Sequence, residues 1–367
     1  MSFDIGIIGL AKSGRTTIFN TLTRGSVDTG TYTAENAAHI GVAKVPEPRL
    51  NILADMLHPK KVTLVSVTYV DIGASVKDLA KDKGIGGKLL TQLTEVDALI
   101  NVVRAFKDDS IPHPDGSLDI DRDVANMNLE LAFSDLALLE RRLGRLEVSL
   151  KGAKPPERPG LLREQELLVK LKSELEKDIP IRELNLNPDE TRILAGYQFL
   201  TAKPLLIATN IGEDQIPQVE SMEATLNTRY SRPKCRALAL CGKLEMELAQ
   251  LDDTEAHELR TGYSIKESGA DRIIKLSYEL LGLISFFTIV SAEVRAWSIP
   301  RGIDAVRAAG KIHSDMERGF IRAEVVRFDD LVKSGNLAEA RKRGLLRLEG
   351  KSYTVQDGDV ITFLFNV

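Results

Sequence analysis

The sequence has little cysteine, few aromatic residues and no long apolar run. Its 367 residues include two cysteines and one tryptophan, and aromatic residues make up 5%. Cys235 and Cys241 have no Cys or His partners at metal-ligand spacing, so we interpret them as free thiols of a reducing cytosol. The longest apolar stretch, 280–290, is interrupted by Gly282 and Ser285 and is too short to span a bilayer, so no membrane contact is expected.

Positive charge is not in excess either. The formal net charge is −4 and the sequence pI is near 5.9, so no global field attracts the chain to nucleic acid, and no DNA partner is expected. No charged leader with a long apolar run begins the sequence, which favours a cytoplasmic location. The five histidines are scattered, without a spacing that indicates a metal site or a Ser/His/Asp triad. We expect a monomer.

The sequence does contain a series of short apolar runs that end in polar or small residues. The runs cover 3–9, 62–72, 98–104, 204–210 and, more weakly, 236–241. Helical patterns separate them, which is typical of an α/β domain with a parallel sheet covered on both faces. Ligands of such sheets bind at the carboxyl ends of the strands. The candidate residues at these ends are Gly9, Asp71, Asn210 and Cys241.

A heptad pattern follows in the middle of the sequence. Its apolar positions alternate spacings of three and four: Leu129, Ala132, Leu136, Leu139, Leu143, Leu146 and Leu150. The segment 151–160 breaks the pattern, which resumes at Leu161, Leu168, Leu171 and Leu175. The simplest interpretation is an antiparallel coiled-coil hairpin inserted in the α/β domain. Two ordinary surface helices packed on the core are the alternative.

The pattern of apolar and polar residues changes again from about residue 283. Short strand-like runs and a helix near 304–312, with others around 329–343, indicate a compact α+β module. Residues 300–351 contain twelve Lys or Arg against eight Asp or Glu, a local excess of four. Candidate phosphate-contacting residues for an RNA surface are Arg301, Arg307, Lys311, Arg318 and Arg322. A solvated face of mixed charge is the alternative.

The segment 9–17 (GLAKSGRTT) follows a strand and opens a helix expected at 15–23, the context that a phosphate-binding loop requires. Gly9 and Gly14 permit the tight turn that points backbone amides at phosphates. The candidate nucleotide ligands here are Lys12, Ser13, Gly14, Arg15, Thr16 and Thr17. Thr16 has the hydroxyl expected on Mg²⁺, whereas Arg15 replaces the usual Lys with a larger, planar cation. A glycine-rich turn without a ligand is the alternative.

Two further strand ends complete the candidate site. Asp71 lies where P-loop proteins hold Mg²⁺ through water, with a helix N-cap as the alternative. The glycine of the usual D-x-x-G motif comes one place early, at Gly73. Asn210 and Glu213 lie where a base-reading motif belongs, but they differ from the N-K-x-D of GTPases, which argues against a strong guanine preference. An Asx-turn is the alternative for Asn210.

With these motifs, the chain resembles the Obg-like ATPase (YchF) family of P-loop proteins along nearly its whole length. The resemblance rests on GIIGLAKSGRTTIFNTLT, KGIGGKLLTQLTEVDALINVVRAF, LTAKPLLIATN, and above all EVRAWSIPRG, AAGKIHSDMERGFIRAEVVRFDDLV and EGKSYTVQDGDVITFLFNV. It implies a G domain in two parts (1–126 and 200–282), an inserted coiled-coil hairpin (127–199) and a C-terminal TGS domain of β-grasp fold (283–367).

The resemblance also implies ligands and partners. ATP is expected over GTP through Asn210 and Glu213, with Mg²⁺ on Thr16 and Asp71. The third base-binding loop, Cys241-Gly242, offers backbone amides to the base. Members of the family are associated with ribosomes and with translation or stress responses, so a ribosome or another RNA–protein surface is the expected partner.

The chain departs from the family at the loops that sense the γ-phosphate. Arg15 replaces Lys, residues 32–36 (YTAEN) supply no clear Mg²⁺-binding Thr, and Ser75 lies near the position that replaces the catalytic Gln. We therefore assign no catalytic residue. Two functions stay open: a slow ATPase switch, and a hydrolysis-impaired or non-enzymatic module that docks through the hairpin and the TGS domain.

Overall fold

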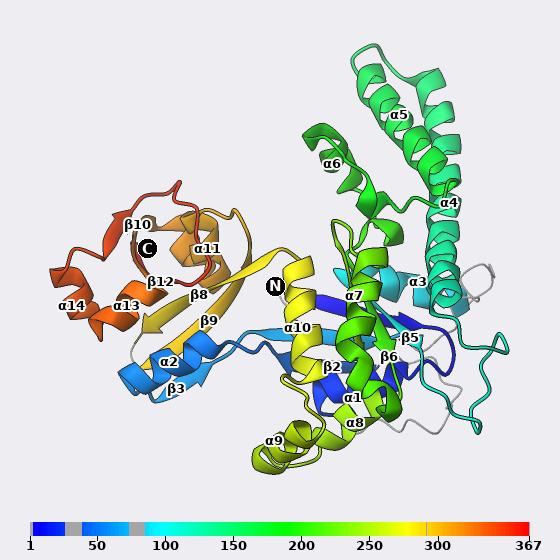
Figure 1. The fold of residues 1–367 in the computed structure, drawn as a ribbon. Coiled ribbons are helices and arrows are strands. Elements are labelled where there is room, and N and C mark those ends of the chain that lie inside the picture. Colours follow the sequence, from blue (N-terminus) through cyan, green and yellow to red (C-terminus); the bar gives the residue numbers. More distant parts are fainter. Residues whose placement is uncertain (1–2, 26–38, 73–84, 291, 367) are drawn as a thin grey trace. The chain divides into compact units, whose positions relative to one another are not determined.

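The computed structural model describes residues 3–25, 39–72, 85–290 and 292–366 (Figure 1). The chain forms two compact units. The larger unit comprises Phe3–Gly41 and Thr68–Ile273, whereas the smaller unit joins Val42–Val67 to Ile274–Val367. No helix among the described residues is both long and apolar enough to cross a bilayer. The domain boundaries expected at residues 126, 199 and 282 stay predictions.

A six-stranded sheet forms the centre of the larger unit. Its strands, in order across the sheet, are β2 (His39–Lys44), β4 (Ser66–Asp71), β1 (Asp4–Gly9), β5 (Ala98–Arg104), β6 (Leu205–Asn210) and β7 (Cys235–Leu240). All neighbours from β4 to β7 are parallel. Strands β5 and β6 are buried along their whole length, as expected when both faces of a parallel sheet are covered. The strands predicted at 3–9, 98–104, 204–210 and 236–241 are thus confirmed.

Helices surround this sheet. Their bounds are α1 (Arg15–Thr23), α3 (Ile85–Glu95), α7 (Val219–Tyr230), α8 (Gly242–Leu248), α9 (Asp253–Gly262) and α10 (Gly269–Leu280), with short 3-10 turns η2 (Ile181–Glu183), η3 (Leu200–Ala202) and η4 (Glu213–Gln218). Leu93 of α3 and Leu226 of α7 pack with the strand residues Leu205 and Ile207 in one buried core. Helix α1 begins at Arg15 and ends at Thr23, as the sequence predicts.

The apolar run at 62–72, which the sequence presents as one strand, is divided between two sheets. Its first part belongs to β3 (Lys61–Thr63), which pairs in parallel with a strand of the smaller unit, and its second part is β4 of the larger sheet. The two apolar residues between them, Leu64 and Val65, pack against a core of the smaller unit.

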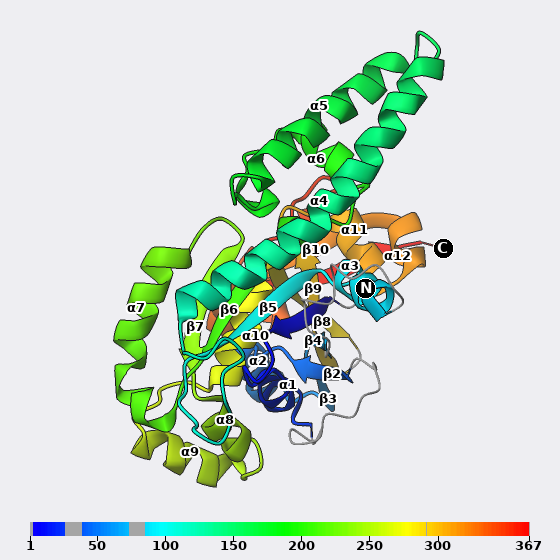
Figure 2. The ribbon, with the colours of Figure 1, turned by 90° about the vertical axis from the view of Figure 1, so that its right-hand side faces the viewer.

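Two long helices form a hairpin within the larger unit, α4 (Ile120–Gly152) and α5 (Arg158–Leu175), and they lie side by side in both ribbon views (Figure 2). The short helix α6 (Pro188–Leu194) follows. Asp119 caps α4 by accepting a hydrogen bond from the Arg122 amide. The buried leucines shared by the two helices include Leu139, Leu146, Leu168, Leu171 and Leu175. Leu129 was expected in this seam but is 42% exposed, so the packed seam begins farther along α4.

A buried polar cluster joins the base of the hairpin to the turns that lead back to the sheet. The Asp135 carboxylate on α4 accepts hydrogen bonds from the Leu200 amide, the Thr201 amide and the Thr201 hydroxyl. Arg182 donates to the Thr201 carbonyl and to the Asn128 side chain. Burial raises the pKa of Asp135 to about 6, although the hydrogen bonds from Thr201 act in the opposite direction.

A second six-stranded sheet forms the smaller unit. Its strands, in order, are β11 (Arg347–Glu349), β10 (Phe320–Arg327), β12 (Asp359–Phe365), β8 (Leu283–Val290), β9 (Glu293–Pro300) and β3. The helices are α2 (Pro48–Leu57), α11 (Ala305–Ile312), α12 (Ser314–Arg318), α13 (Phe328–Ser334) and α14 (Leu337–Lys342). The antiparallel pair β8–β9, the following helix α11 and the parallel pairing of β8 with β12 are the arrangement of a β-grasp fold.

Alternate residues of these strands face two separate cores. Ile284 and Phe286 of β8 pack in a core with α11, while Phe287 of the same strand packs in another core with Leu50 and Leu53 of α2. Because successive side chains of a strand point to opposite faces, the two cores lie on opposite sides of the sheet. Residues 42–67 therefore supply both an edge strand and a covering helix to a unit that is otherwise C-terminal.

Candidate nucleotide site

The loop between β1 and α1 has the backbone shape of a phosphate-binding loop. Gly14 is the N-cap of α1 with φ of 88°, and Lys12 also has positive φ, at 64°. A Cβ on Gly9 would lie 2.6 Å from the Val102 carbonyl oxygen of β5, so this position accepts only glycine. The loop is closed by a hydrogen bond from the Ser13 amide to the Leu10 carbonyl. The free amides of a helix N-terminus then face any ligand placed above the loop.

Asn210 connects this loop to the other two loops of the candidate site. Its Nδ2 donates to the Ser13 carbonyl oxygen at 3.0 Å, and its Oδ1 accepts from the Gly242 amide at 3.0 Å. The side chain is 4% exposed. Gly14 leaves room for it, because a Cβ on Gly14 would lie 2.2 Å from Asn210 Nδ2. The predicted residues of strands β1, β6 and β7 therefore meet at one edge of the sheet, where ligands of α/β proteins bind.

Arg15 forms an ion pair with Asp71 at the end of β4. The Arg15 Nε donates to Asp71 Oδ1 at 3.1 Å, and the Arg15 Nη1 donates to the Gly9 carbonyl oxygen at 3.2 Å. The Thr16 hydroxyl donates to the second oxygen, Oδ2, at 2.8 Å. The Nδ1 of His39 lies 3.9 Å from the same oxygen. Asp71 is 2% exposed, so its charge is balanced almost entirely by neighbouring groups of the protein.

The base-reading candidate Glu213 is engaged by two side chains. Lys243 donates to its Oε1 at 2.8 Å, and the Tyr263 hydroxyl donates to its Oε2 at 3.4 Å. The hydrogen bond from Lys243 holds the pKa of Glu213 below its ordinary value. Cys241, the N-cap position of α8, is buried, and burial raises the pKa of its thiol, so it offers backbone groups and not a reactive thiolate.

The remaining residues predicted for the phosphate loop are Lys12, Ser13 and Thr17. Thr17 lies in α1, where its carbonyl oxygen accepts from the Thr21 hydroxyl, and Lys12 is exposed. The side chain of Ser13 is buried, and its hydroxyl lies close to Gly9 of the same loop. The altered first switch, residues 32–36, and the second-switch residues 73–75 lie outside the described residues.

Phe106, which follows β5, is a neighbour of the loop that the sequence reasoning did not single out. Its ring lies 3.9 Å from the ideal Cβ position of Gly14, and the Arg104 guanidinium stacks over it at 4.4 Å. The amides of Ala105 and Phe106 both donate to the Asn210 carbonyl oxygen. The signal in the sequence was an aromatic residue two places beyond a strand end, where an aromatic side chain can contact a ligand.

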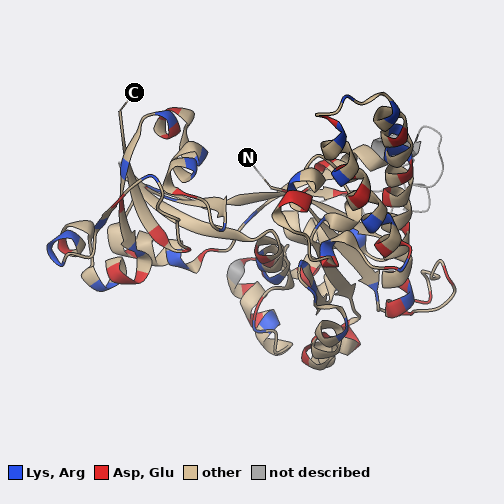
Figure 3. Cartoon of the chain, turned by 90° about the horizontal axis from the view of Figure 1, so that it is seen from above, with Lys and Arg blue, Asp and Glu red and all other residues tan. Residues whose placement is uncertain are grey.

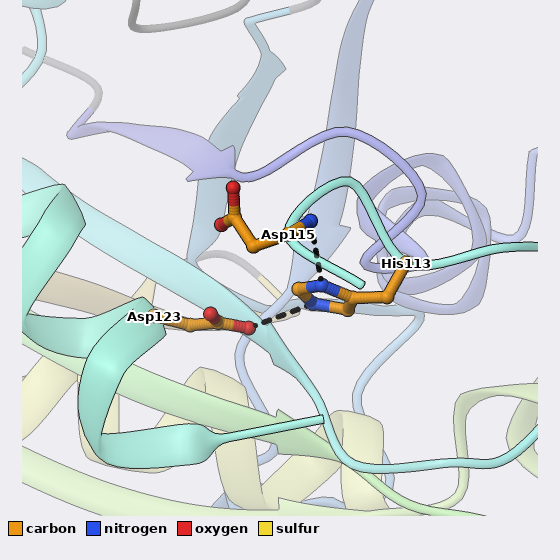
Figure 4. A group of neighbouring side chains, drawn as sticks. All are labelled: His113, Asp115 and Asp123. Carbon is orange, nitrogen blue, oxygen red and sulfur yellow. Dashed lines mark hydrogen bonds and ion pairs between the residues drawn. The ribbon is translucent and has the colours of Figure 1, made fainter. Parts of the chain in front are cut away.

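A second polar cluster lies beneath the loop (Figure 4). The Nε2 of His113 and Oδ2 of Asp123 lie 2.9 Å apart, and the Asp115 amide donates to His113 Nδ1 at 3.1 Å. Because Nδ1 accepts, Nε2 carries the proton and donates to Asp123. Arg122 donates to the other oxygen of Asp123. The scattered histidines gave no sign of this cluster, which the described residues bring within metal-ligand range. Both ring nitrogens of His113 take part in hydrogen bonds, so we interpret the cluster as a structural clamp.

Charges of both signs are mixed on the smaller unit (Figure 3). Among the basic residues proposed for RNA contact, Arg307 pairs with Asp304 and Arg318 pairs with Asp315. Arg301 and Arg322 are exposed, on the turn after β9 and on β10. The smaller unit therefore has both the exposed basic side chains that RNA contact requires and the acidic partners that a solvated face of mixed charge requires.

Comparison with known proteins extends these observations. Residues 283–366 match the family model YchF-GTPase_C, described as a protein of unknown function (DUF933). The chain is 38% identical to the "Ribosome-binding ATPase YchF" of Bacillus subtilis (strain 168) and 35% identical to that of Escherichia coli O157:H7, and in both cases the match covers 100% of each chain. The structure of the Schizosaccharomyces pombe YchF GTPase superposes with a TM-score of 0.83 at 27% identity, covering 99% of this chain and 98% of that one. With its P-loop, inserted helices and C-terminal sheet, the chain belongs to the YchF family.

Proposed function

We propose that this protein binds ATP in the loops joined by Asn210 and uses the bound nucleotide to control docking on the ribosome. The observation that carries the proposal is the meeting of three loops at one sheet edge, with the Asn210 side chain bonded to both Ser13 and Gly242. The backbone of the phosphate loop and the base loop are thereby held in a fixed relation before any ligand arrives. Such preorganisation lowers the cost of ordering on binding.

The surroundings of Glu213 support ATP over GTP. A carboxylate that reads guanine must accept hydrogen bonds from two N–H groups of the base. Here both Glu213 oxygens already accept hydrogen bonds, and Lys243 neutralises the charge. Guanine would have to displace these partners, whereas adenine has no such pair of donors on its ring edge. The two bacterial relatives are called ATPases, in agreement with this preference, whereas the Schizosaccharomyces pombe protein is called a GTPase.

Ribosome docking is proposed from the same relatives, whose names describe ribosome binding. The basic residues of the smaller unit and the hairpin α4–α5 are the surfaces that we assign to it. Exposed Arg301 and Arg322 can contact phosphates directly, while Arg307 and Arg318 would exchange an acidic neighbour for a phosphate. Because ribosomes are cytoplasmic, we propose that the protein acts in the cytoplasm.

Hydrolysis is proposed to be slow. Phosphoryl transfer depends on positive charge placed at the γ-phosphate, and Arg15 directs its Nε and one Nη at protein oxygens. The Mg²⁺ expected on Thr16 and Asp71 does not suit the donor set as it stands, because the Arg15 guanidinium already forms an ion pair with Asp71. Nucleotide binding, more than cleavage, is the activity that this site supports.

Calorimetric titration of ATP, ADP and GTP into the full-length protein tests the proposal. We expect ATP and ADP to bind at least about tenfold more tightly than GTP, a difference of about 1.4 kcal/mol. Equal affinity for ATP and GTP would remove the base preference, and no heat with any nucleotide would contradict the proposed function. The alternative of a module that binds ribosomes without nucleotide would then be favoured.

Co-sedimentation with ribosomes tests docking. Binding should weaken steeply as salt rises, because phosphate contacts release counterions. Arg301→Glu with Arg322→Glu should lower the bound fraction, whereas Lys266→Glu, a charge reversal at one position of the larger unit, should not. Lys266 is 85% exposed, so its replacement leaves the fold unchanged. A bound fraction that ignores both salt and the paired Arg changes would contradict docking through this surface.

A further inference from the structure

We propose that the Arg15 guanidinium takes the place of Mg²⁺ as the cationic partner of Asp71, so that nucleotide binding at this site needs no divalent cation. The inference rests on the proposed nucleotide-binding function. It concerns one ion pair, between Arg15 Nε and Asp71 Oδ1 at 3.1 Å, and its neighbours in the loop.

Both oxygens of the Asp71 carboxylate already accept hydrogen bonds from the protein. In a P-loop site this carboxylate accepts hydrogen bonds from water on the metal ion, and the Thr hydroxyl binds the ion directly. The Thr16–Asp71 hydrogen bond is compatible with that arrangement, since a hydroxyl oxygen can bind a metal while its hydrogen is donated. The Arg15–Asp71 bond is not, because it engages Oδ1, one of the two carboxylate oxygens that would accept from such water, and places a positive charge beside it.

The negative charge of Asp71 is balanced by Arg15. Asp71 is almost fully buried, and an unpaired buried carboxylate beside a triphosphate would repel it strongly. In sites with the usual Lys, the metal ion removes that repulsion. Here the Arg15 guanidinium balances the charge of Asp71, so the nucleotide meets an ion pair that is already neutral. A divalent cation that entered would instead face a fixed guanidinium and a carboxylate whose charge is balanced.

Arg15 is held in this position by more than one hydrogen bond. Its Nη1 donates to the Gly9 carbonyl oxygen at 3.2 Å, and its side chain is 14% exposed. A Lys at the same position has no planar fork, and its donors are gathered on one nitrogen, so it would not reproduce the two bonds that Nε and Nη1 make to Asp71 and Gly9. Replacing Arg15 by Lys should therefore release Asp71 and restore its demand for a metal ion.

The experiment measures the affinity of full-length protein for ATP by calorimetry in excess Mg²⁺ and in excess EDTA. For the native protein we expect the two dissociation constants to agree within about threefold, and for Arg15→Lys we expect a loss of at least about tenfold in EDTA. Arg24→Lys makes the same change at the exposed C-terminal end of α1 and should behave like the native protein. Thermal denaturation confirms that each variant is folded.

The outcomes separate this inference from the proposed function. ATP that binds the native protein in Mg²⁺ but about tenfold or more weakly in EDTA would overturn the inference and leave the function intact. ATP that binds in neither condition would overturn both. The comparison of the native protein in the two solutions decides the matter even if Arg15→Lys fails to fold.

Discussion

The Asn210 side chain donates to the Ser13 carbonyl oxygen at 3.0 Å, across 197 positions of sequence. This bond fixes the phosphate loop to the end of β6 at a point where neither residue reaches solvent. The Asn210 side chain also accepts a hydrogen bond from the Gly242 amide, so this one side chain links three loops. This link leads to two predictions, and the buried residues of the hairpin lead to two more.

Asn210→Ala should damage nucleotide binding and stability together. The change leaves the Ser13 carbonyl and the Gly242 amide buried without these partners, a cost of about 2–4 kcal/mol in the free energy of unfolding. Affinity for ATP, measured by calorimetry, should fall at least about tenfold. Asn227→Ala is the matched control, because it also removes an amide that makes two hydrogen bonds, but on α7. Native ATP affinity in Asn210→Ala would refute the linking role.

Gly14→Ala should abolish ATP binding, and Gly116→Ala should not. Both glycines have positive φ, at 88° and 79°, so each substitution costs about 1–2 kcal/mol of backbone strain. Only at Gly14 would the new Cβ also meet a neighbour, Asn210 Nδ2 at 2.2 Å, whereas nothing lies within 4 Å at Gly116. Chemical denaturation and ATP titration of both variants measure the difference. Equal behaviour of the two variants would show that contact with Asn210 is irrelevant.

Asp135 should make stability depend on pH. Burial raises its pKa from 3.8 to about 6, so between these values the folded state holds a proton that the unfolded state has lost. Folding is then favoured at low pH, and this contribution is lost as pH rises from about 4 to about 6, by up to ~3 kcal/mol. The measurement is the unfolding free energy of the native protein relative to Asp135→Asn across that range. The exposed Asp189→Asn serves as control, and a difference that stays constant with pH would contradict the prediction.

Leu168→Ala should destabilise the hairpin without weakening ATP binding. Leu168 is fully buried between α4 and α5, so truncation to Ala should cost about 2–5 kcal/mol. Leu162 on the same helix is 45% exposed, and its replacement by Ala should cost less than about 0.5 kcal/mol. Chemical denaturation gives these costs, and calorimetry gives the ATP affinity. A loss of ATP affinity in Leu168→Ala alone would show that the hairpin and the phosphate loop are coupled.

Much of the nucleotide site could be predicted because its signals are local. Gly9 and Asn210 stand at the ends of apolar strands, and the parallel order of these strands brings their ends together. The helix that starts at Arg15 follows from the same short segment. The bonds within the site were not predictable in the same way. Arg15 and Asp71 are 56 positions apart, and only the folded chain shows that the guanidinium turns toward the carboxylate.

The fold shows the same division between local and distant information. The leucine pattern correctly indicated two helices that pack together, since Leu139, Leu168 and Leu171 recur at helical spacing. It could not show that Leu129 lies outside their shared core, because the pattern carries no information on where the partner helix ends. Nor could a three-residue strand such as β3 be recognised, since so short a run has no periodicity of its own.

The pairing of β3 with β9 has a consequence for how this protein can be divided. A fragment that starts at residue 283 would lack Leu50 and Leu53, which cover Phe287 and Val294 on one face of its sheet. It would expose that face to water and leave β9 as an open edge, two features that promote aggregation. The C-terminal fold therefore cannot be moved into another protein by recombination at a single point. The transferred sequence must also include residues 42–67 or a substitute for them.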